Sequence, residues 1–335
     1  MSWMERFFGK KTTLNKIQNQ DPDEDNISFV EKHMIRIRSR NFFGTYNRSP
    51  NGKYIIAWRD QDIDGNRQGG FRESGLGDYV LLEDGEAIAE GRLERPECGK
   101  TADNGTFILH DEHFGQNMAG TFFSFDKSGT ELMRHSFSAN LLNNGLSPDG
   151  RFVICQACNS DTDSGNGLVL FDLEDGEILW NIVPPSGWAK SYEFDVHEAI
   201  VYLIYKDEGR YAYSMADGDF MDWERWENDR IDHGSPYEQM QIAKQRLEIL
   251  GSGMDPQSAG EIVFIIKKAI ANGLTETPTE HGKALRMLGE LWETLGDLEE
   301  ALKCYEEAIS IYPKVGVKGK IKNLRVRFNQ VSDGF

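Results

Sequence analysis

Two places in the sequence bring together residues that could bind a metal ion, and the first is the acidic run DQDIDG at 60–65. Its carboxylates alternate and a glycine follows them, as at the start of a calcium-binding loop. The candidate ligands are Asp60, Asp62 and Asp64. The later ligand positions fall on Gln68 and Phe71, so the bidentate acid that ends such loops is missing. We therefore favour an acidic surface loop and keep calcium binding as the alternative.

The second place is the pair Cys155 and Cys158, which has the spacing of zinc ligands. A structural zinc site needs a second pair of ligands, and the candidates for it are Cys98, His110 and His113. Cys155 lies within a predicted strand and Cys158 near its end, where the geometry of a zinc knuckle does not fit. We interpret both residues as ordinary buried or edge cysteines.

Motifs of catalysis are missing from the sequence, which contains no nucleophile elbow, phosphate loop or dinucleotide fingerprint. The run from Gly65 to Gly77 is rich in glycine, but Arg67 stands where a dinucleotide fingerprint begun at Gly65 needs its second glycine. A flexible hairpin loop is the better interpretation. We therefore predict a protein that is not an enzyme and needs no cofactor, apart from the calcium alternative.

Composition and charge indicate which partners and which cellular location to expect. The 335 residues carry 55 acidic and 37 basic side chains, and the net charge of -18 argues against nucleic acid or an anionic membrane as the main partner. The four cysteines are too few and too scattered for a disulfide framework, so a reducing cytoplasm is the simplest location. Because no apolar run of about 18 residues occurs, we expect no membrane span.

A repeat of turns and short apolar runs positions these residues. Glycine turns recur about every 40 to 50 residues, at Gly85, Gly129, Gly176 and Gly218. A second set lies upstream of them, in the segments SPNGKYIIAW at 49–58, ADNGTFILHD at 102–111, SPDGRFVICQ at 147–156 and FDVHEAIVYLIY at 194–205, of which the last has lost its glycine. Proline presets φ and glycine accepts positive φ in such turns. The order predicts four units of about four strands each.

This pattern resembles the β-propeller superfamily over residues 42–223. The turns SPDGR and SPNGK are similar to those of WD-repeat propellers, and FDLEDGEILW is similar to a blade hairpin of quinoprotein-type propellers. The resemblance implies a propeller-like domain of about four blades and no particular activity. The sequence leaves three arrangements open, namely a closed ring of four blades, a blade completed by residues 34–46, or an open arc with exposed sheet edges.

After residue 234 the apolar period changes from about 2 to about 3.6 residues, which predicts helices. Ser235 and Asp255 begin two of them, each followed by proline, and Thr277 with Glu280 predicts a capping box for a third. The last segment is predicted to be a capping helix with basic residues at Lys314, Lys318, Lys320, Lys322, Arg325 and Arg327. We interpret these as a solvated face, with an acidic partner, nucleic acid or the protein's own acidic domain as alternatives.

From Gly282 to Lys314 the sequence resembles a tetratricopeptide repeat. The positions that the family fills with leucine, small residues, aromatic residues and proline are matched by Leu288, Gly289, Trp292, Gly296, Ala301, Tyr305, Ala308 and Pro313. The resemblance implies a pair of helices whose first member lines a partner-binding groove. The predicted partner-binding residues are those that match this groove, Lys283, Arg286, Met287, Glu290, Glu293 and Thr294.

Taken together, the patterns predict an α+β multidomain protein with an all-β propeller-like domain followed by an all-α tetratricopeptide-like helical domain. Its expected parts are an N-terminal segment and acidic linker (1–33), the propeller-like domain (34–223), a hinge (224–234) and the helical domain (235–335). The main hypothesis is a cytoplasmic, non-enzymatic adaptor or scaffold for other proteins or peptides. The alternatives are a ligand- or metal-binding propeller, including an enzymatic one, with an accessory helical domain, and a self-assembling subunit of a homo-oligomer.

Overall fold

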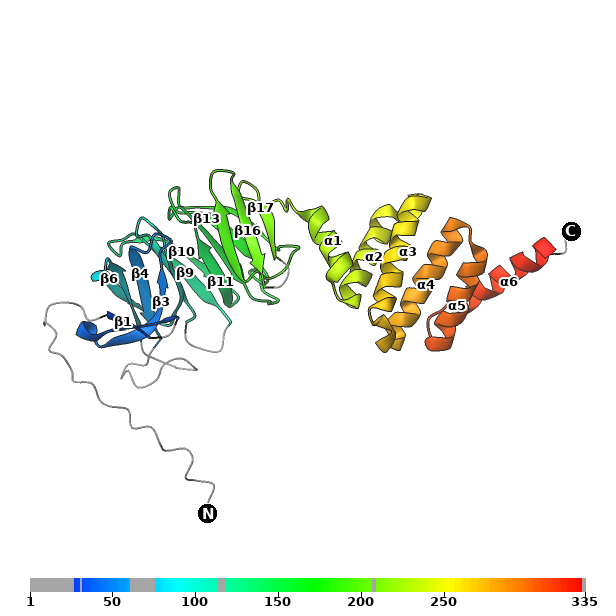
Figure 1. Ribbon diagram of the computed structural model, residues 1–335, viewed down its shortest axis with the longest axis horizontal. Coiled ribbons are helices and arrows are strands. Elements are labelled where there is room, and N and C mark those ends of the chain that lie inside the picture. Colours follow the sequence, from blue (N-terminus) through cyan, green and yellow to red (C-terminus); the bar gives the residue numbers. More distant parts are fainter. Residues whose placement is uncertain (1–26, 31, 61–75, 114–117, 207–208, 333–335) are drawn as a thin grey trace, which may run out of the picture. The chain divides into compact units, whose positions relative to one another are not determined.

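The computed structural model describes residues 27–30, 32–60, 76–113, 118–206 and 209–332, without the side chains of residue 252 and of 328–332. Strands β1 to β17 come first in the chain and helices α1 to α6 follow them (Figure 1). The predicted order of an all-strand part followed by an all-helical part is therefore confirmed. No helix in the described ranges is both long and apolar enough to cross a membrane.

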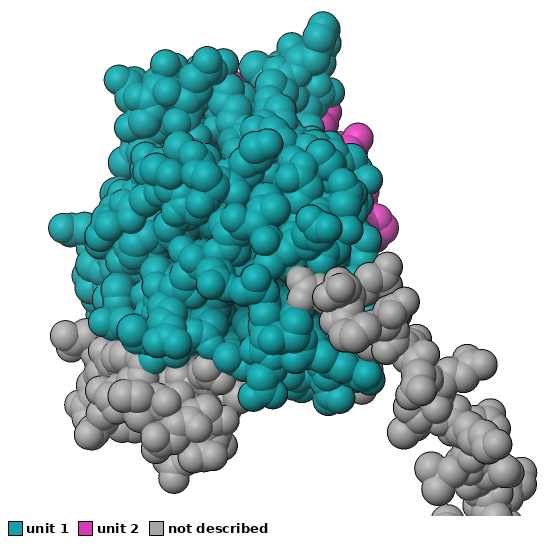
Figure 2. Space-filling model, turned by 90° about the vertical axis from the view of Figure 1, so that its left-hand side faces the viewer, with its two compact units in different colours: residues 1–184, 191–199, 215–217 teal, residues 185–190, 200–214, 218–335 magenta. Residues whose placement is uncertain are grey.

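The chain divides into two compact units, which are described separately. The first comprises residues 1–184, 191–199 and 215–217, and the second comprises residues 185–190, 200–214 and 218–335. Figure 2 shows one face of the first unit in teal. The division runs through the fourth sheet, because β15 belongs to the first unit and β16 and β17 to the second.

Four antiparallel sheets form the strand part, which is propeller-like. The first sheet has the order β1-β2-β3-β4-β5-β6, with β1 Ile27–Val30, β2 Met34–Ile37, β3 Phe42–Arg48, β4 Tyr54–Arg59, β5 Gly77–Glu83 and β6 Glu86–Leu93. The second has the order β10-β9-β8-β7, with β7 Pro96–Thr101, β8 Phe107–Asp111, β9 Gly120–Phe125 and β10 Glu131–Phe137. The third has the order β11-β12-β13-β14, with β11 Leu141–Leu146, β12 Phe152–Ala157, β13 Leu168–Asp172 and β14 Glu177–Ile182. The fourth has the order β15-β16-β17, with β15 Ser191–Asp195, β16 Ile200–Tyr205 and β17 Gly209–Ser214.

The predicted upstream turns connect one sheet to the next. The backbone N–H of Asn51 in the first sheet's turn donates to Asp103 Oδ1 at 2.7 Å, and Asn104 Nδ2 donates to the Asp149 carbonyl at 2.7 Å. Gly150 takes φ 79°, and a Cβ there would lie 2.5 Å from Asn104 Oδ1. Glycine is therefore required at this position both by the backbone conformation and by the close approach of the neighbouring turn.

Apolar side chains fill the spaces between the sheets of the first unit. Trp58 and Leu81 of the first sheet share one core with Phe107 and Leu109 of the second. A second core joins the second and third sheets through residues such as Phe122 and Val153, which are fully buried. The sheets therefore stack face to face through buried aromatic and branched residues, as successive propeller blades do.

The hairpin β1–β2 covers the face of the first sheet that points away from the second sheet. Ile35 and Ile37 of β2 pack in one core with Ala57 of β4 and Val80 of β5, and all four are buried. Gly44 in β3 has no room for a side chain, since its Cβ would lie 2.2 Å from the Trp58 carbonyl oxygen, and this close approach accompanies the curl of the sheet. The end of the segment predicted as a linker thus forms strand β1 and continues the first sheet.

The fourth sheet lacks the outer strand that the repeat predicts. After β17 the expected strand is reduced to a single bridge between Tyr213 and Phe220. Residues 224–234, predicted as a hinge, instead lie almost entirely in helix α1, Trp223–His233. The reason is aromatic packing, because the Phe220 ring contacts those of Trp223 and Trp226 and gives the otherwise polar helix an apolar side.

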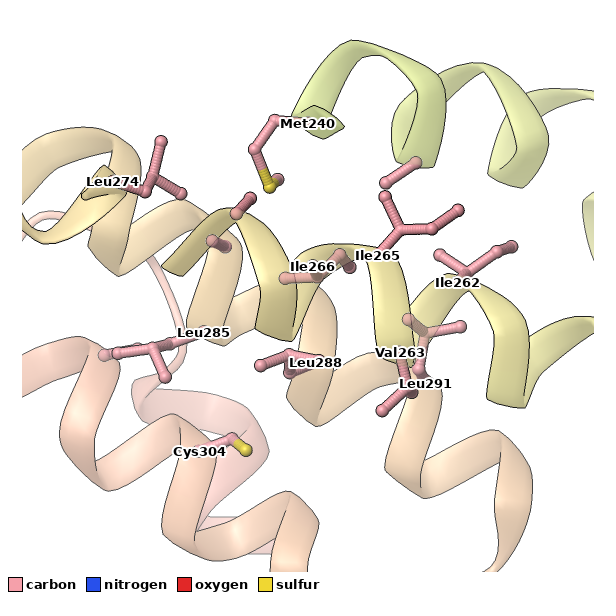
Figure 3. Close-up of a cluster of buried hydrophobic side chains, with 14 of the residues drawn as sticks. Met240, Ile262, Val263, Ile265, Ile266, Leu274, Leu285, Leu288, Leu291 and Cys304 are labelled. Carbon is pink, nitrogen blue, oxygen red and sulfur yellow. The ribbon is translucent and has the colours of Figure 1, made fainter. Parts of the chain in front are cut away.

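The helical array shares one continuous hydrophobic core, part of which is drawn in Figure 3. Its helices are α1, α2 Pro236–Leu250, α3 Pro256–Ala271, α4 Pro278–Leu295, α5 Leu298–Ile311 and α6 Lys318–Ser332. Ile262 and Ile266 of α3 and Leu285 and Leu288 of α4 are buried in it. These residues recur at helical spacing, so each helix presents one apolar side to its neighbours.

The caps of these helices agree with the sequence in two cases and differ in a third. The Ser235 hydroxyl accepts from the Glu238 N–H in a complete capping box, and Asp255 Oδ1 accepts from the Gln257 N–H at 2.9 Å and the Ser258 N–H at 3.0 Å. Thr277 makes no capping hydrogen bond, so the prediction of a capping box there is wrong. The Glu280 carboxylate accepts instead from Lys283 Nζ.

Candidate partner-binding surface

The six predicted partner-binding residues lie on one side of α4. Their spacing of three or four residues places them above one another on a helix. Lys283, Arg286 and Thr294 are exposed, whereas Glu290 and Glu293 are half-buried. Met287 is also half-buried and packs against the helical core. The structure therefore brings five of the six together at the surface and gives Met287 a packing role.

Helix α6 lies beside this side of α4 and adds a residue to it. Lys320 Nζ is 3.6 Å from both Glu290 Oε1 and Glu293 Oε2. Arg286 Nη1 donates to the Val315 carbonyl at 3.3 Å, just before α6 begins. We call Lys283, Arg286, Glu290, Glu293, Thr294 and Lys320 the α4–α6 surface. Lys320 belongs to the basic segment of the sequence, and nothing in its local spacing pointed to α4.

The basic side chains of the α4–α6 surface are all paired with carboxylates. Lys283 Nζ lies 2.7 Å from Glu280 Oε1, and Arg286 Nε lies 3.0 Å from Glu290 Oε1. The hydrogen bond with Glu280 raises the pKa of Lys283. Exposed ion pairs contribute little to folding, so a partner that offers its own charged groups can replace them.

Tyr305 connects this surface to the core of the array. Its side chain is fully buried, and Lys320 Nζ lies 5.3 Å from the centre of its ring. Burial and the nearby Glu293 carboxylate raise the pKa of Tyr305, so its hydroxyl stays protonated. A Cβ on Gly289 would lie 2.4 Å from Tyr305 Cε1, which shows how closely α4 and α5 approach. The surface therefore lies on a closely packed helix pair.

Of the three candidate calcium ligands, the structure describes Asp60. Asp60 is buried, and its Oδ2 accepts from Arg95 Nε at 3.3 Å. Asp62 and Asp64 lie outside the described residues. Calcium binding at this loop stays a prediction.

A second cluster of possible ligands occurs in the first unit. Atoms of Glu94, Asp111 and His113 lie within 4.8 Å of one another. The two Asp111 oxygens accept the backbone N–H groups of Glu94 and Arg95, each at 2.9 Å, and the ring of His113 lies 2.8 Å from Thr121 Oγ1. These hydrogen bonds fix the chain before β7 to the end of β8, which is a structural role.

His110 and Cys155, two of the residues singled out by the sequence, lie side by side in the core. His110 Nε2 is 3.8 Å from Cys155 Sγ, and both side chains are buried. Burial lowers the pKa of His110 to about 3 and raises that of Cys155. Burial also raises the pKa of Cys98 to about 11. Among the described residues the pair of His110 and Cys155 is not part of any group of three metal-ligating side chains, which favours packed core residues.

A pocket of about 700 Å³ lies between α1, α2 and α3, apart from the predicted residues on α4. Gly260 and Phe264 of α3 line it, together with the acidic Glu224 of α1. Sequence reasoning missed this pocket. The available signal was Phe264, a large aromatic residue that lies off the apolar side of α3 and is 59% exposed.

Comparisons with known proteins agree with the helical part of this description. Residues 282–315 match the model of the tetratricopeptide repeat, which confirms the predicted repeat. Among solved structures the chain is similar to the crystal structure of the C-terminal WD40 domain of Sif2, with 13% identity and a TM-score of 0.35. That match covers 52% of this chain and 46% of the other, which is less than half its length. No curated protein matches the sequence. The propeller-like architecture therefore rests on the sheets themselves.

Proposed function

We propose that this protein is a non-enzymatic scaffold that binds segments of other proteins through its helical array. The observation that carries the proposal is the α4–α6 surface, a row of charged side chains on the first helix of a tetratricopeptide repeat. Helical repeats of this kind present side chains from successive helices to extended or helical peptides. A cytoplasmic location is part of the same proposal.

The α4–α6 surface supports a partner that carries both charges. Its three basic groups, Lys283, Arg286 and Lys320, face the carboxylates of Glu280, Glu290 and Glu293, so neither sign is in excess. A peptide with alternating charges can exchange ion pairs with these groups without leaving one unpaired.

The test is affinity capture of partners with the full-length chain and with charge-reversal variants. Arg286→Glu and Glu290→Lys should each raise the Kd for specific partners about tenfold, or about 1.4 kcal/mol, and so reduce their yield. The double variant restores an ion pair of opposite direction between the two positions. If the partners recognise the charge pattern, the double variant should still fail to bind them. If the single variants lose the partners only because their fold is weaker, the double variant should bind them again.

The matched control is Lys303→Glu on α5, an exposed residue that pairs with Glu299 and Glu300 away from this surface. It should keep the full yield. If Arg286→Glu and Glu290→Lys recover the same partners at the same yield as the parent chain, the α4–α6 surface is not the binding site. The alternatives of ligand or metal binding by the strand domain and of homo-oligomer formation stay predictions.

A further inference from the structure

The pocket between α1, α2 and α3 has three apolar side chains among polar and charged ones, and one of the three is large and exposed. Ile231 of α1 is 8% exposed and Ile265 of α3 is 2% exposed, so both lie deep in the array. Phe264 is 59% exposed beside them. The exposed phenylalanine ring offers apolar surface that an apolar side chain of a bound ligand can bury. We call this site the α1–α3 pocket.

Gly260 provides the space that such a side chain needs. It lies one turn before Phe264 on α3, and a Cβ built on it would meet no atom within 4 Å. Any larger residue at this position would project into the open volume. Glycine in the interior of a helix costs about 1 kcal/mol relative to alanine, and neither a turn nor a close helix contact explains it here.

Charged groups around the α1–α3 pocket leave negative charge in excess. The carboxylates are those of Glu224, Glu227, Asp232 and Glu261, and the basic groups are those of Arg246 and Lys268. Four acids against two bases leave two uncompensated negative charges. Glu224 makes no ion pair or hydrogen bond with any residue that the structure describes.

The basic groups at the pocket are already engaged by the protein. Arg246 Nε and Nη2 bind the two Glu227 oxygens at 3.1 Å and 2.9 Å, and its Nη1 lies 3.2 Å from Glu261 Oε2. Lys268 Nζ lies 2.6 Å from Asp232 Oδ1. Neither base is therefore free to neutralise Glu224, whose carboxylate offers its charge to a bound cation.

We propose that the α1–α3 pocket binds a short segment of a partner protein in which a basic residue lies next to a bulky apolar residue. The apolar side chain lies over Gly260 against Phe264, and the basic side chain pairs with Glu224. The proposal deepens the scaffold function by adding a second site with its own class of partner, and charge complementarity is the argument for that partner.

The experiment measures fluorescence anisotropy of labelled peptides with the full-length chain. The probe is Gly-Ser-Phe-Arg-Lys-Phe-Gly-Ser, and two control peptides replace either both basic residues by glutamate or both phenylalanines by serine. The probe should bind saturably, and each control peptide should bind at least about tenfold more weakly, because each lacks one of the two features that the pocket recognises.

Variants of the pocket then locate the binding. Gly260→Leu fills the space and Phe264→Ser removes the exposed ring, and each should weaken the probe at least about tenfold. Glu224→Gln should weaken it about threefold to fivefold and reduce the salt dependence of binding. The matched control Tyr237→Ser removes another exposed aromatic residue, on α2 and outside the lining, and should leave the affinity unchanged.

Several outcomes would overturn the proposal. Absence of saturable binding, equal binding of the basic and the glutamate peptide, or an unchanged affinity in Gly260→Leu would each do so. Self-association that Phe264→Ser abolishes would assign the pocket to a second copy of the chain instead. Arg286→Glu on the α4–α6 surface should not affect the probe, so failure of this site and failure of the scaffold function can be told apart.

Discussion

Neighbouring sheets of the first unit share apolar cores and are also joined at their turns by hydrogen bonds from Asn51 and Asn104. The helices of the second unit are joined mainly by apolar side chains that pack against small residues such as Gly289. A polar joint depends on the identity of one residue at one place. An apolar joint depends on shape, and many residue combinations satisfy it. The strand repeats can therefore be identified from residue types that recur at fixed spacing. The helical repeats are identified from apolar periodicity and from the few positions where two helices approach closely.

The largest effect that this comparison predicts is at Gly289. The substitution Gly289→Val should lower the free energy of unfolding by about 3 kcal/mol or more, because the new side chain overlaps the buried ring of Tyr305. Urea unfolding followed by far-ultraviolet circular dichroism measures the change. Gly260→Val is the matched control, since no atom lies within 4 Å of its Cβ, and its effect should stay below about 1 kcal/mol. Similar losses in both variants would mean that shape does not set the α4–α5 contact.

A smaller effect is expected in the sheets, whose folding stability should fall at acid pH because of the buried His110. The folded pKa of His110 is about 3 and its ordinary value is 6.5, so below pH 6.5 the unfolded chain binds a proton that the folded chain excludes. Stability from this residue is present above pH 6.5 and is lost as the pH falls, by about 1.4 kcal/mol per unit. Between pH 6.5 and about 5 the loss should reach about 2 kcal/mol.

The measurement is urea unfolding across this pH range, with hydrogen exchange of β8 and β12 to follow the strand domain. His110→Gln should remove a large part of the pH dependence, whatever its effect on the stability near neutral pH, and the remainder includes His135, whose pKa is also lowered by burial. An unchanged slope in this variant would assign the acid sensitivity to other groups.

The smallest effect tests a single polar joint. Asn104→Ala removes the hydrogen bond to the Asp149 carbonyl and the one that Asn104 Oδ1 accepts from the Thr106 N–H, and should cost about 1 to 1.5 kcal/mol. Thermal unfolding of the parent and the variant measures the difference. The exposed Asn140, whose side chain makes no hydrogen bond to any described residue, serves as the control, and Asn140→Ala should change the stability very little. If both variants behave alike, the contacts between the turns do not stabilise the stack of sheets.

The architecture could be predicted from the sequence wherever it depends on residues that are close together in the chain. The glycine turns, the Ser235 capping box and the repeat from Gly282 to Lys314 all depend on residues close together in the chain, and each appears as expected. The helix at 223–233 was missed because its apolar side comes from Trp223 and Trp226, which pack on Phe220 just before the helix. Without that contact the segment is polar throughout and indicates a hinge.

The candidate binding sites were less predictable than the fold. The row of residues on α4 followed from helical spacing, but the approach of Lys320 from α6 depends on tertiary packing through Val317 and Leu324. The α1–α3 pocket depends on which helices lie next to each other, and no local sequence pattern predicts how helices pack. The exposed Phe264 was the single residue that departed from the apolar side of its own helix.

The hairpin β1–β2 has a consequence for how this domain can change in evolution. In a ring, the outer face of the first blade packs on the last blade, so the number of blades fixes the angle between all of them. Here the core formed by Ile35 and Ile37 with Ala57 and Val80 covers that face with the protein's own N-terminal strands. A duplication or deletion of one whole blade inside the array would leave this cover in place. Related chains of different length can therefore share the same first sheet.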